Sequence, residues 1–62
     1  MWYHVINRHR GALSIQGSYK TKDAADRRSE SITGGETFVF ASYSSDPTVV
    51  LAEFRDAEVE GV

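Results

Sequence analysis

The sequence contains no cysteine, and this absence removes two ways of stabilising a small domain. Disulfides and cysteine-based zinc sites are both excluded in a chain of 62 residues. Chains of this length bury only a small hydrophobic core, and many depend on cross-links, a metal or a partner chain. We therefore expect either a modest self-sufficient core or association with a second chain.

Long hydrophobic runs are also missing. The apolar stretch at residues 2–6 is interrupted by His4 and followed by the basic residues 8–10. A secretory signal needs an apolar run of about 7–15 residues, and a membrane span needs about 20. We expect a soluble cytoplasmic protein that makes no membrane contact.

Motifs for enzymatic, metal or cofactor chemistry are absent as well. No serine lies in a Gly-x-Ser-x-Gly elbow, and His4 and His9 are five residues apart, a spacing that fits neither a helical nor a strand metal site. Gly34 and Gly35 lack the longer glycine pattern of a phosphate-binding loop. We expect no catalytic activity and no cofactor, and we expect His4 to be packed or hydrogen bonded within a sheet.

The composition is that of an ordinary globular domain, with 40% hydrophobic and 26% charged residues. Three segments are typical of β-strands by composition or by alternation. Residues 2–7 have apolar side chains of both parities, which suits a central strand. Residues 12–19 alternate, with Leu13, Ile15 and Tyr19 expected on one face. Residues 36–43 form the third predicted strand.

The segment between the second and third strands is predicted to be a helix. Thr21 is a good N-cap, acidic residues come early and basic residues come late, as the helix macrodipole favours. We expect the helix to run to about Ile32 and to be ended by Gly34 or Gly35 in a left-handed conformation.

The last third of the sequence is compatible with two structures. As a helix, it would have Asp46 as N-cap and Pro47 at the first position, with Val50, Leu51, Phe54 and Ala57 on one face. As a strand, residues 48–54 would pair with residues 37–43 as a C-terminal hairpin. The capping residues and the spacing favour the helix.

These elements predict an α+β fold in the order β-β-α-β-α. The first strand would be central in a three-stranded antiparallel-type sheet, flanked by the second and the third. Both helices are expected on one face, which makes a single two-layer domain of residues 1–62 and leaves the other sheet face open. The alternative is a β-β-α-β-β chain.

The net charge of −2 conceals two halves of opposite sign. Residues 1–31 have six basic and three acidic side chains, whereas residues 32–62 have one basic and six acidic side chains. A basic cluster is expected at the first hairpin and at the strand-helix junction, and its members are the candidate contacts for an anion or a partner: Arg8, His9, Arg10, Lys20 and Lys22. Trp2 and Tyr3 are candidate exposed aromatic side chains on the open sheet face.

Two functional hypotheses follow. The first is a non-enzymatic interaction module that self-associates or binds a protein partner through its open sheet face or an edge strand. The alternative is a nucleic-acid-binding module, because a basic hairpin tip can contact phosphates and sheet aromatics can stack on bases. The sequence pI of about 5.5 counts against the alternative.

Part of the sequence resembles a known type of DNA-binding domain. Residues 2–5 and 17–25 are similar to the strand-to-helix junction of the arm-type domains at the front of phage and transposon integrases. The resemblance covers fewer than half of the residues. Strand residues follow the helix here and the C-terminal half is acidic, so the chain departs from those domains in both order and charge, and we assign no family from it.

Overall fold

The chain folds into the predicted order of three strands and two helices. The computed structural model describes residues 1–60, with side chains described up to residue 58. The elements are β1 (Trp2–His9), β2 (Ala12–Tyr19), α1 (Lys22–Ser31), β3 (Glu36–Ser42) and α2 (Pro47–Glu60).

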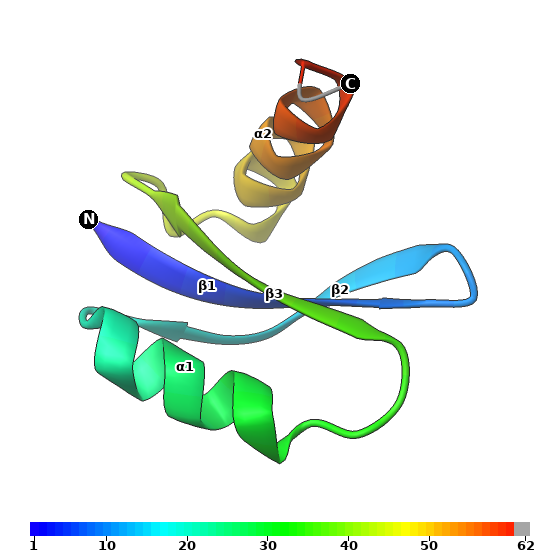
Figure 1. The fold of residues 1–62 in the computed structure, drawn as a ribbon. Helices are drawn as coiled ribbons and strands as arrows, with labels where there is room; N and C mark the ends of the chain where they lie inside the picture. The colour runs from blue at the N-terminus through cyan, green and yellow to red at the C-terminus, as the bar shows by residue number, and fades with distance from the viewer. Residues whose placement is uncertain (61–62) are drawn as a thin grey trace.

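The three strands form one sheet with β1 in the centre, which confirms the predicted order (Figure 1). Both β2 and β3 run antiparallel to β1. The first connection is shorter than the sequence indicated, because β1 and β2 pair as far as His9 and Ala12 and only Arg10 and Gly11 form the loop. Both loop residues have positive φ, at 54° and 80°, as a tight two-residue hairpin requires.

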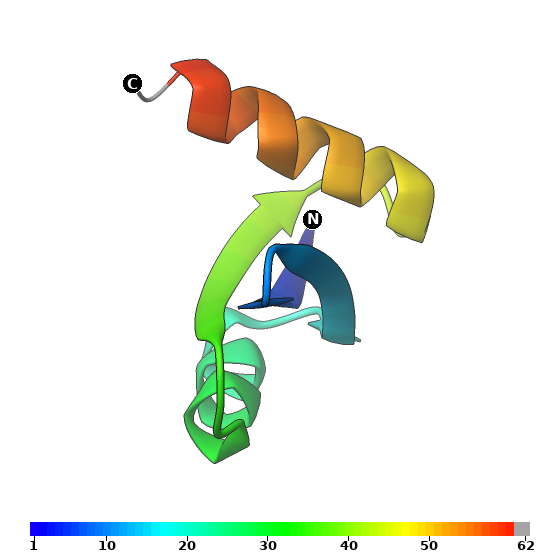
Figure 2. The same cartoon turned by 90° about the vertical axis from the view of Figure 1, so that its right-hand side faces the viewer.

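The two helices cover opposite faces of the sheet, so the prediction that both lie on one face was wrong. Figures 1 and 2 show α1 on one side of the sheet and α2 on the other. The fold is therefore a three-layer α+β arrangement, and neither sheet face is left entirely open.

The reason lies in the apolar side chains of β1, which need cover on both faces. Ile6 lies between Ile15 and Phe38 and packs with Val50 and Phe54 of α2. Val5 points to the other face, where it lies between Gly17 and Val39. This face is covered by α1, whose Ala25 is buried. Each fully buried aliphatic side chain stabilises the fold by about 1.5–3 kcal/mol, so exposing either face would be costly in so small a core.

A β-bulge in β2 changes which residues share a face. Ile15 pairs with Ile6 and Gly17 pairs with Val5, so Gln16 is an extra residue between them. Tyr19 therefore lies on the α1 face, whereas Ile15 lies on the α2 face. The prediction that Tyr19 and Ile15 share one face was wrong. Arg28 of α1 donates a hydrogen bond to the Gln16 carbonyl, at 3.4 Å.

The prediction of a helix in the last third of the chain is confirmed. Asp46 caps α2, since its Oδ1 accepts from the Thr48 N–H at 2.9 Å and its carbonyl accepts from the Val50 N–H at 2.9 Å. Val50 and Phe54 are buried as expected, but Ala57 is exposed.

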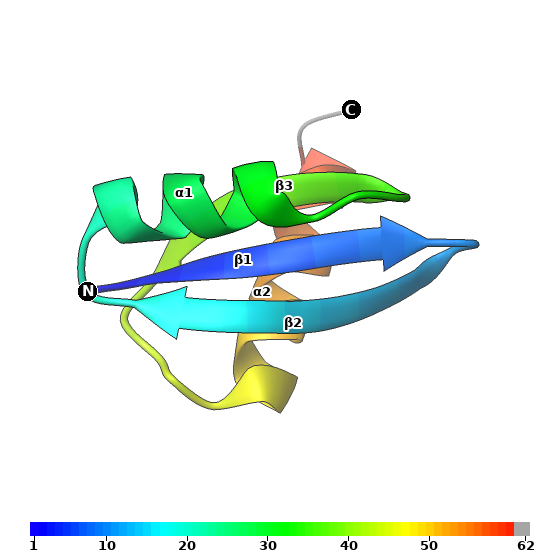
Figure 3. The ribbon, with the colours of Figure 1, turned by 90° about the horizontal axis from the view of Figure 1, so that it is seen from below.

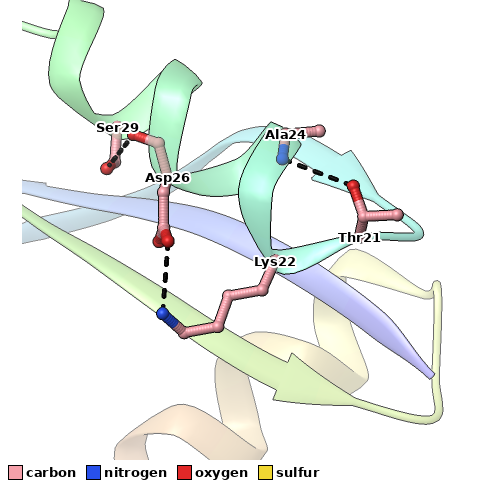
Figure 4. A network of polar contacts seen from close by, with 5 residues as sticks. All are labelled: Thr21, Lys22, Ala24, Asp26 and Ser29. Atoms are coloured by element: carbon pink, nitrogen blue, oxygen red, sulfur yellow. Dashed lines mark hydrogen bonds and ion pairs between the residues drawn. The ribbon is translucent and has the colours of Figure 1, made fainter.

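The predicted N-cap of α1 is also confirmed (Figure 4). Thr21 Oγ1 accepts from the Ala24 N–H at 3.3 Å, and Lys22 pairs with Asp26 at 3.2 Å one turn along the helix. Neither glycine ends α1, because the C-cap is Ile32 in an extended conformation. Gly34 and Gly35 have φ of 88° and 72° and turn the chain into β3.

We expect Gly35→Ala to destabilise the protein more than Gly34→Ala, as measured by chemical denaturation. A side chain at either position meets the roughly 1–2 kcal/mol cost of the left-handed region. At Gly35 the added Cβ would also clash with the Arg8 carbonyl oxygen, whereas at Gly34 it would meet nothing within 4 Å. Relieving that contact adds about 1–3 kcal/mol. Equal losses for the two variants would contradict the close approach of this turn to β1.

Candidate functional site

The predicted basic cluster is divided between the two ends of the sheet. Arg8, His9 and Arg10 lie at the hairpin end of β1, whereas Lys20 and Lys22 lie near Trp2 at its start. The eight residue steps from Trp2 to Arg10 span roughly 26 Å at about 3.3 Å per residue. The structure therefore does not bring the five basic residues together into one surface.

At the hairpin end, Arg8 is engaged in contacts within the chain. Its guanidinium pairs with Glu58 of α2 and lies 5.4 Å from the centroid of the Phe38 ring. His9 and Arg10 are exposed. The free positive charge at this end is thus smaller than the sequence indicated.

At the opposite end, the structure does bring together residues that the sequence singled out. The Lys20 ammonium lies 3.9 Å from the centroid of the Trp2 ring, a cation–π contact. Tyr3 points to the opposite face of the sheet from Trp2, where it is paired with Tyr19 of β2. Both Trp2 and Tyr3 are half-buried rather than fully exposed. Lys22 is exposed and pairs with Asp26, as Figure 4 shows.

A buried polar network on the α2 face connects β1 to the loop before α2. His4 is fully buried; its Nε2 lies 2.8 Å from the Ser44 carbonyl and its Nδ1 lies 2.7 Å from Ser18 Oγ. A carbonyl only accepts, so the proton is on Nε2, and in the neutral ring Nδ1 accepts from the Ser18 hydroxyl. Ser42 Oγ donates to Glu53 of α2 at 2.7 Å. The prediction that His4 is hydrogen bonded in the sheet is confirmed.

On the α1 face, the buried Asn7 connects β1 to the turn before β3. Its side-chain amide donates to the Gly34 carbonyl at 3.0 Å and lies 3.4 Å from the carbonyl of Glu36 and 3.4 Å from Thr37 Oγ1. Neither this role nor the role of Ser18 was predicted from the sequence. The signal in the sequence was a short polar side chain within an apolar strand. The hydrogen-bond partners of such a side chain depend on the strand register and on the bulge, which the sequence does not show.

These contacts hold neighbouring strands and loops together. Both ring nitrogens of His4 are used, and the part of the chain that the structure describes encloses no pocket and no group of three side chains suited to a metal. Neither α1 nor α2 has the length and apolar character that crossing a membrane requires.

The exposed feature with the clearest binding geometry is the outer edge of β3. β3 pairs with β1 on one side, and beyond it the described residues place no further strand. From Thr37 to Ser42 the strand has no charged residue and no proline, and its pairing with β1 has no register shift. Natural edge strands are commonly protected by such charges, prolines or bulges. We call the outer side of Glu36–Ser42 the β3 edge.

The other edge strand, β2, is less regular than β3. Its bulge at Gln16 interrupts the regular ladder. In Figure 3, α2 crosses behind the sheet, with its N-terminal end beyond β2 and its C-terminal end behind β3. The two edges therefore differ, and the β3 edge is the more regular template.

Comparison with known proteins identifies no relative. No family model, curated protein or solved structure matches this chain. The local likeness of residues 2–5 and 17–25 to integrase arm-type domains therefore gains no support from a family match.

We expect Arg10→Asn to raise the free energy of unfolding by about 1 kcal/mol, because asparagine tolerates the left-handed conformation and suits a two-residue hairpin before Gly11. Arg10→Ala is the matched control, since it removes the same charge without favouring positive φ. Thermal or denaturant unfolding measures both. If alanine stabilises as much as asparagine, charge rather than backbone conformation limits the hairpin.

Proposed function

We propose that the protein is a non-enzymatic interaction module that binds an extended segment of a partner protein along the β3 edge. The observation that carries the proposal is the open, regular and uncharged stretch of backbone from Thr37 to Ser42. An added segment would form main-chain hydrogen bonds with it and extend the sheet, which is a common mode of peptide recognition.

The open sheet face that the sequence predicted does not exist as such, which supports an edge over a face. α1 packs on one side of the sheet and α2 on the other (Figures 1 and 2). The edges are the remaining regular surface at which the sheet itself is accessible.

The β3 edge is held in place at both ends, which favours binding because little ordering is then required. Asn7 fixes the turn before β3 through its contacts with Gly34 and Glu36. His4 fixes the loop after β3 through the Ser44 carbonyl, and Ser42 Oγ accepts from the Ser44 N–H at 3.1 Å. Both anchors come from the central strand.

Side chains of β3 would supply further contact on both faces. Phe38 and Phe40 are half-buried on the α2 face, and Val39 is half-buried on the α1 face. A neighbouring strand would cover the remaining surface of these rings, and aromatic or β-branched cross-strand pairs contribute about 0.2–1 kcal/mol each. Ala41 is exposed on the α1 face of the edge.

The test is titration of the ¹⁵N-labelled protein with an uncharged probe, a seven-residue blocked peptide that alternates serine with valine. We expect chemical-shift changes concentrated in Glu36–Ser42. A lysine on the edge should hinder strand addition, so Ala41→Lys is expected to weaken binding at least fivefold. Ser14→Lys is the matched control, because Ser14 is exposed on β2 at the other edge.

Two results would contradict the proposal. One is that the peptide, at millimolar concentration, changes the chemical shifts of β2 or of neither edge strand. The other is that sedimentation shows a dimer of the free chain that Ala41→Lys dissociates, because the occupant of the β3 edge would then be a second copy.

A further inference from the structure

We infer that the segment bound at the β3 edge is basic. The inference rests on the proposed function and adds the chemical class of the partner. It follows from the distribution of charge around β3, which differs sharply from that around β2.

The helices that border β3 are neutral or acidic. β3 begins with Glu36, which is exposed and forms no ion pair within the described residues. α2 has four acidic residues and one arginine, a net charge of −3. α1 has three residues of each sign and is neutral. β1 has Arg8 opposite Glu36, but its guanidinium pairs with Glu58. The strand β2 is itself uncharged and lies between Arg10 and Lys20 in the chain.

The position of α2 directs this charge toward the β3 edge. In Figure 3, α2 crosses the strands and its C-terminal end lies behind β3. Glu53 hydrogen bonds to Ser42 of β3, so its carboxylate lies at the end of that strand. Glu58 is neutralised by Arg8. Asp56, two residues from the buried Phe54, lies on the outer side of α2 and forms no ion pair in the described part of the chain.

The same geometry disfavours a second copy as the occupant. Two identical strands that pair in antiparallel fashion are related by a twofold axis perpendicular to the sheet, which places both copies of α2 on the same face. The C-terminal parts of the two helices, in which the exposed Glu53 and Asp56 outnumber Arg55, would then approach one another. A basic segment avoids this repulsion and gains attraction of about 0.2–1 kcal/mol for each exposed ion pair.

The experiment compares blocked seven-residue peptides that alternate valine with lysine, serine or glutamate. We expect the lysine peptide to bind at least fivefold more tightly than the glutamate peptide at about 20 mM salt, with the serine peptide between them. Screening at about 1 M salt should reduce the difference to less than twofold. The shifts should again concentrate in β3.

Three controls separate this ladder contact from diffuse attraction to an acidic surface. A lysine peptide with proline at its centre has the same charge but cannot form the ladder, and it should bind at least fivefold more weakly. Glu36→Gln should reduce the preference for lysine over glutamate at least twofold. Asp23→Asn removes the same charge beside the other edge strand and should leave the preference unchanged.

The outcomes distinguish the two proposals. If the serine peptide binds β3 but the lysine and glutamate peptides bind equally, the partner is not selected for basic charge and this inference is wrong. If the glutamate peptide binds best, the sign of the inference is wrong. If no peptide shifts β3, the proposed function itself fails.

Discussion

Burial of both faces of β1 is the constraint on which the rest of the structure depends. His4, Val5, Ile6 and Asn7 are consecutive, and all four are buried. Successive side chains of a strand point to opposite faces, so this run requires cover on both sides of the sheet. One short helix on each face meets that requirement, and among the described residues β2 and β3 remain the edge strands of the sheet.

The buried polar residues of β1 connect this core to the proposed binding surface. An amide or imidazole buried without partners would cost about 1–3 kcal/mol. Asn7 and His4 avoid this cost by bonding to the turn before β3 and to the loop after it. The same bonds that satisfy the core therefore hold β3 in place, and the register of the β3 edge follows from the interior of the protein.

The sequence predicted the elements better than their arrangement. Thr21 and Asp46 marked the starts of both helices because capping is a local property, and the two-sided pattern of residues 2–6 marked the central strand. That pattern also required two covered faces, but the side that each helix takes is decided by packing between distant residues, such as Ile6 with Phe54. The bulge at Gln16 depends on pairing with β1 and leaves no local signal, so the face of Tyr19 was predicted wrongly.

The candidate site was predicted less well, for a related reason. The sequence predicted one basic cluster formed by residues 8–10 and residues 20–22. In the structure, the length of the eight-residue β1 separates these two groups. The partners of the charges, Glu58 for Arg8 and the Trp2 ring for Lys20, arise from tertiary contacts. The uncharged β3 segment was visible in the sequence, but its place at an edge followed from the strand order.

Amide hydrogen exchange of the free protein, resolved by residue, tests the central claim most directly. Both neighbours of β1 protect it, so its amides should exchange slowest. Within Glu36–Ser42, amides that donate to β1 should alternate with amides that exchange at least 100-fold faster, because every second N–H of an open edge faces water. Uniformly slow exchange throughout β3 would show that the edge is already covered, and it would contradict this account.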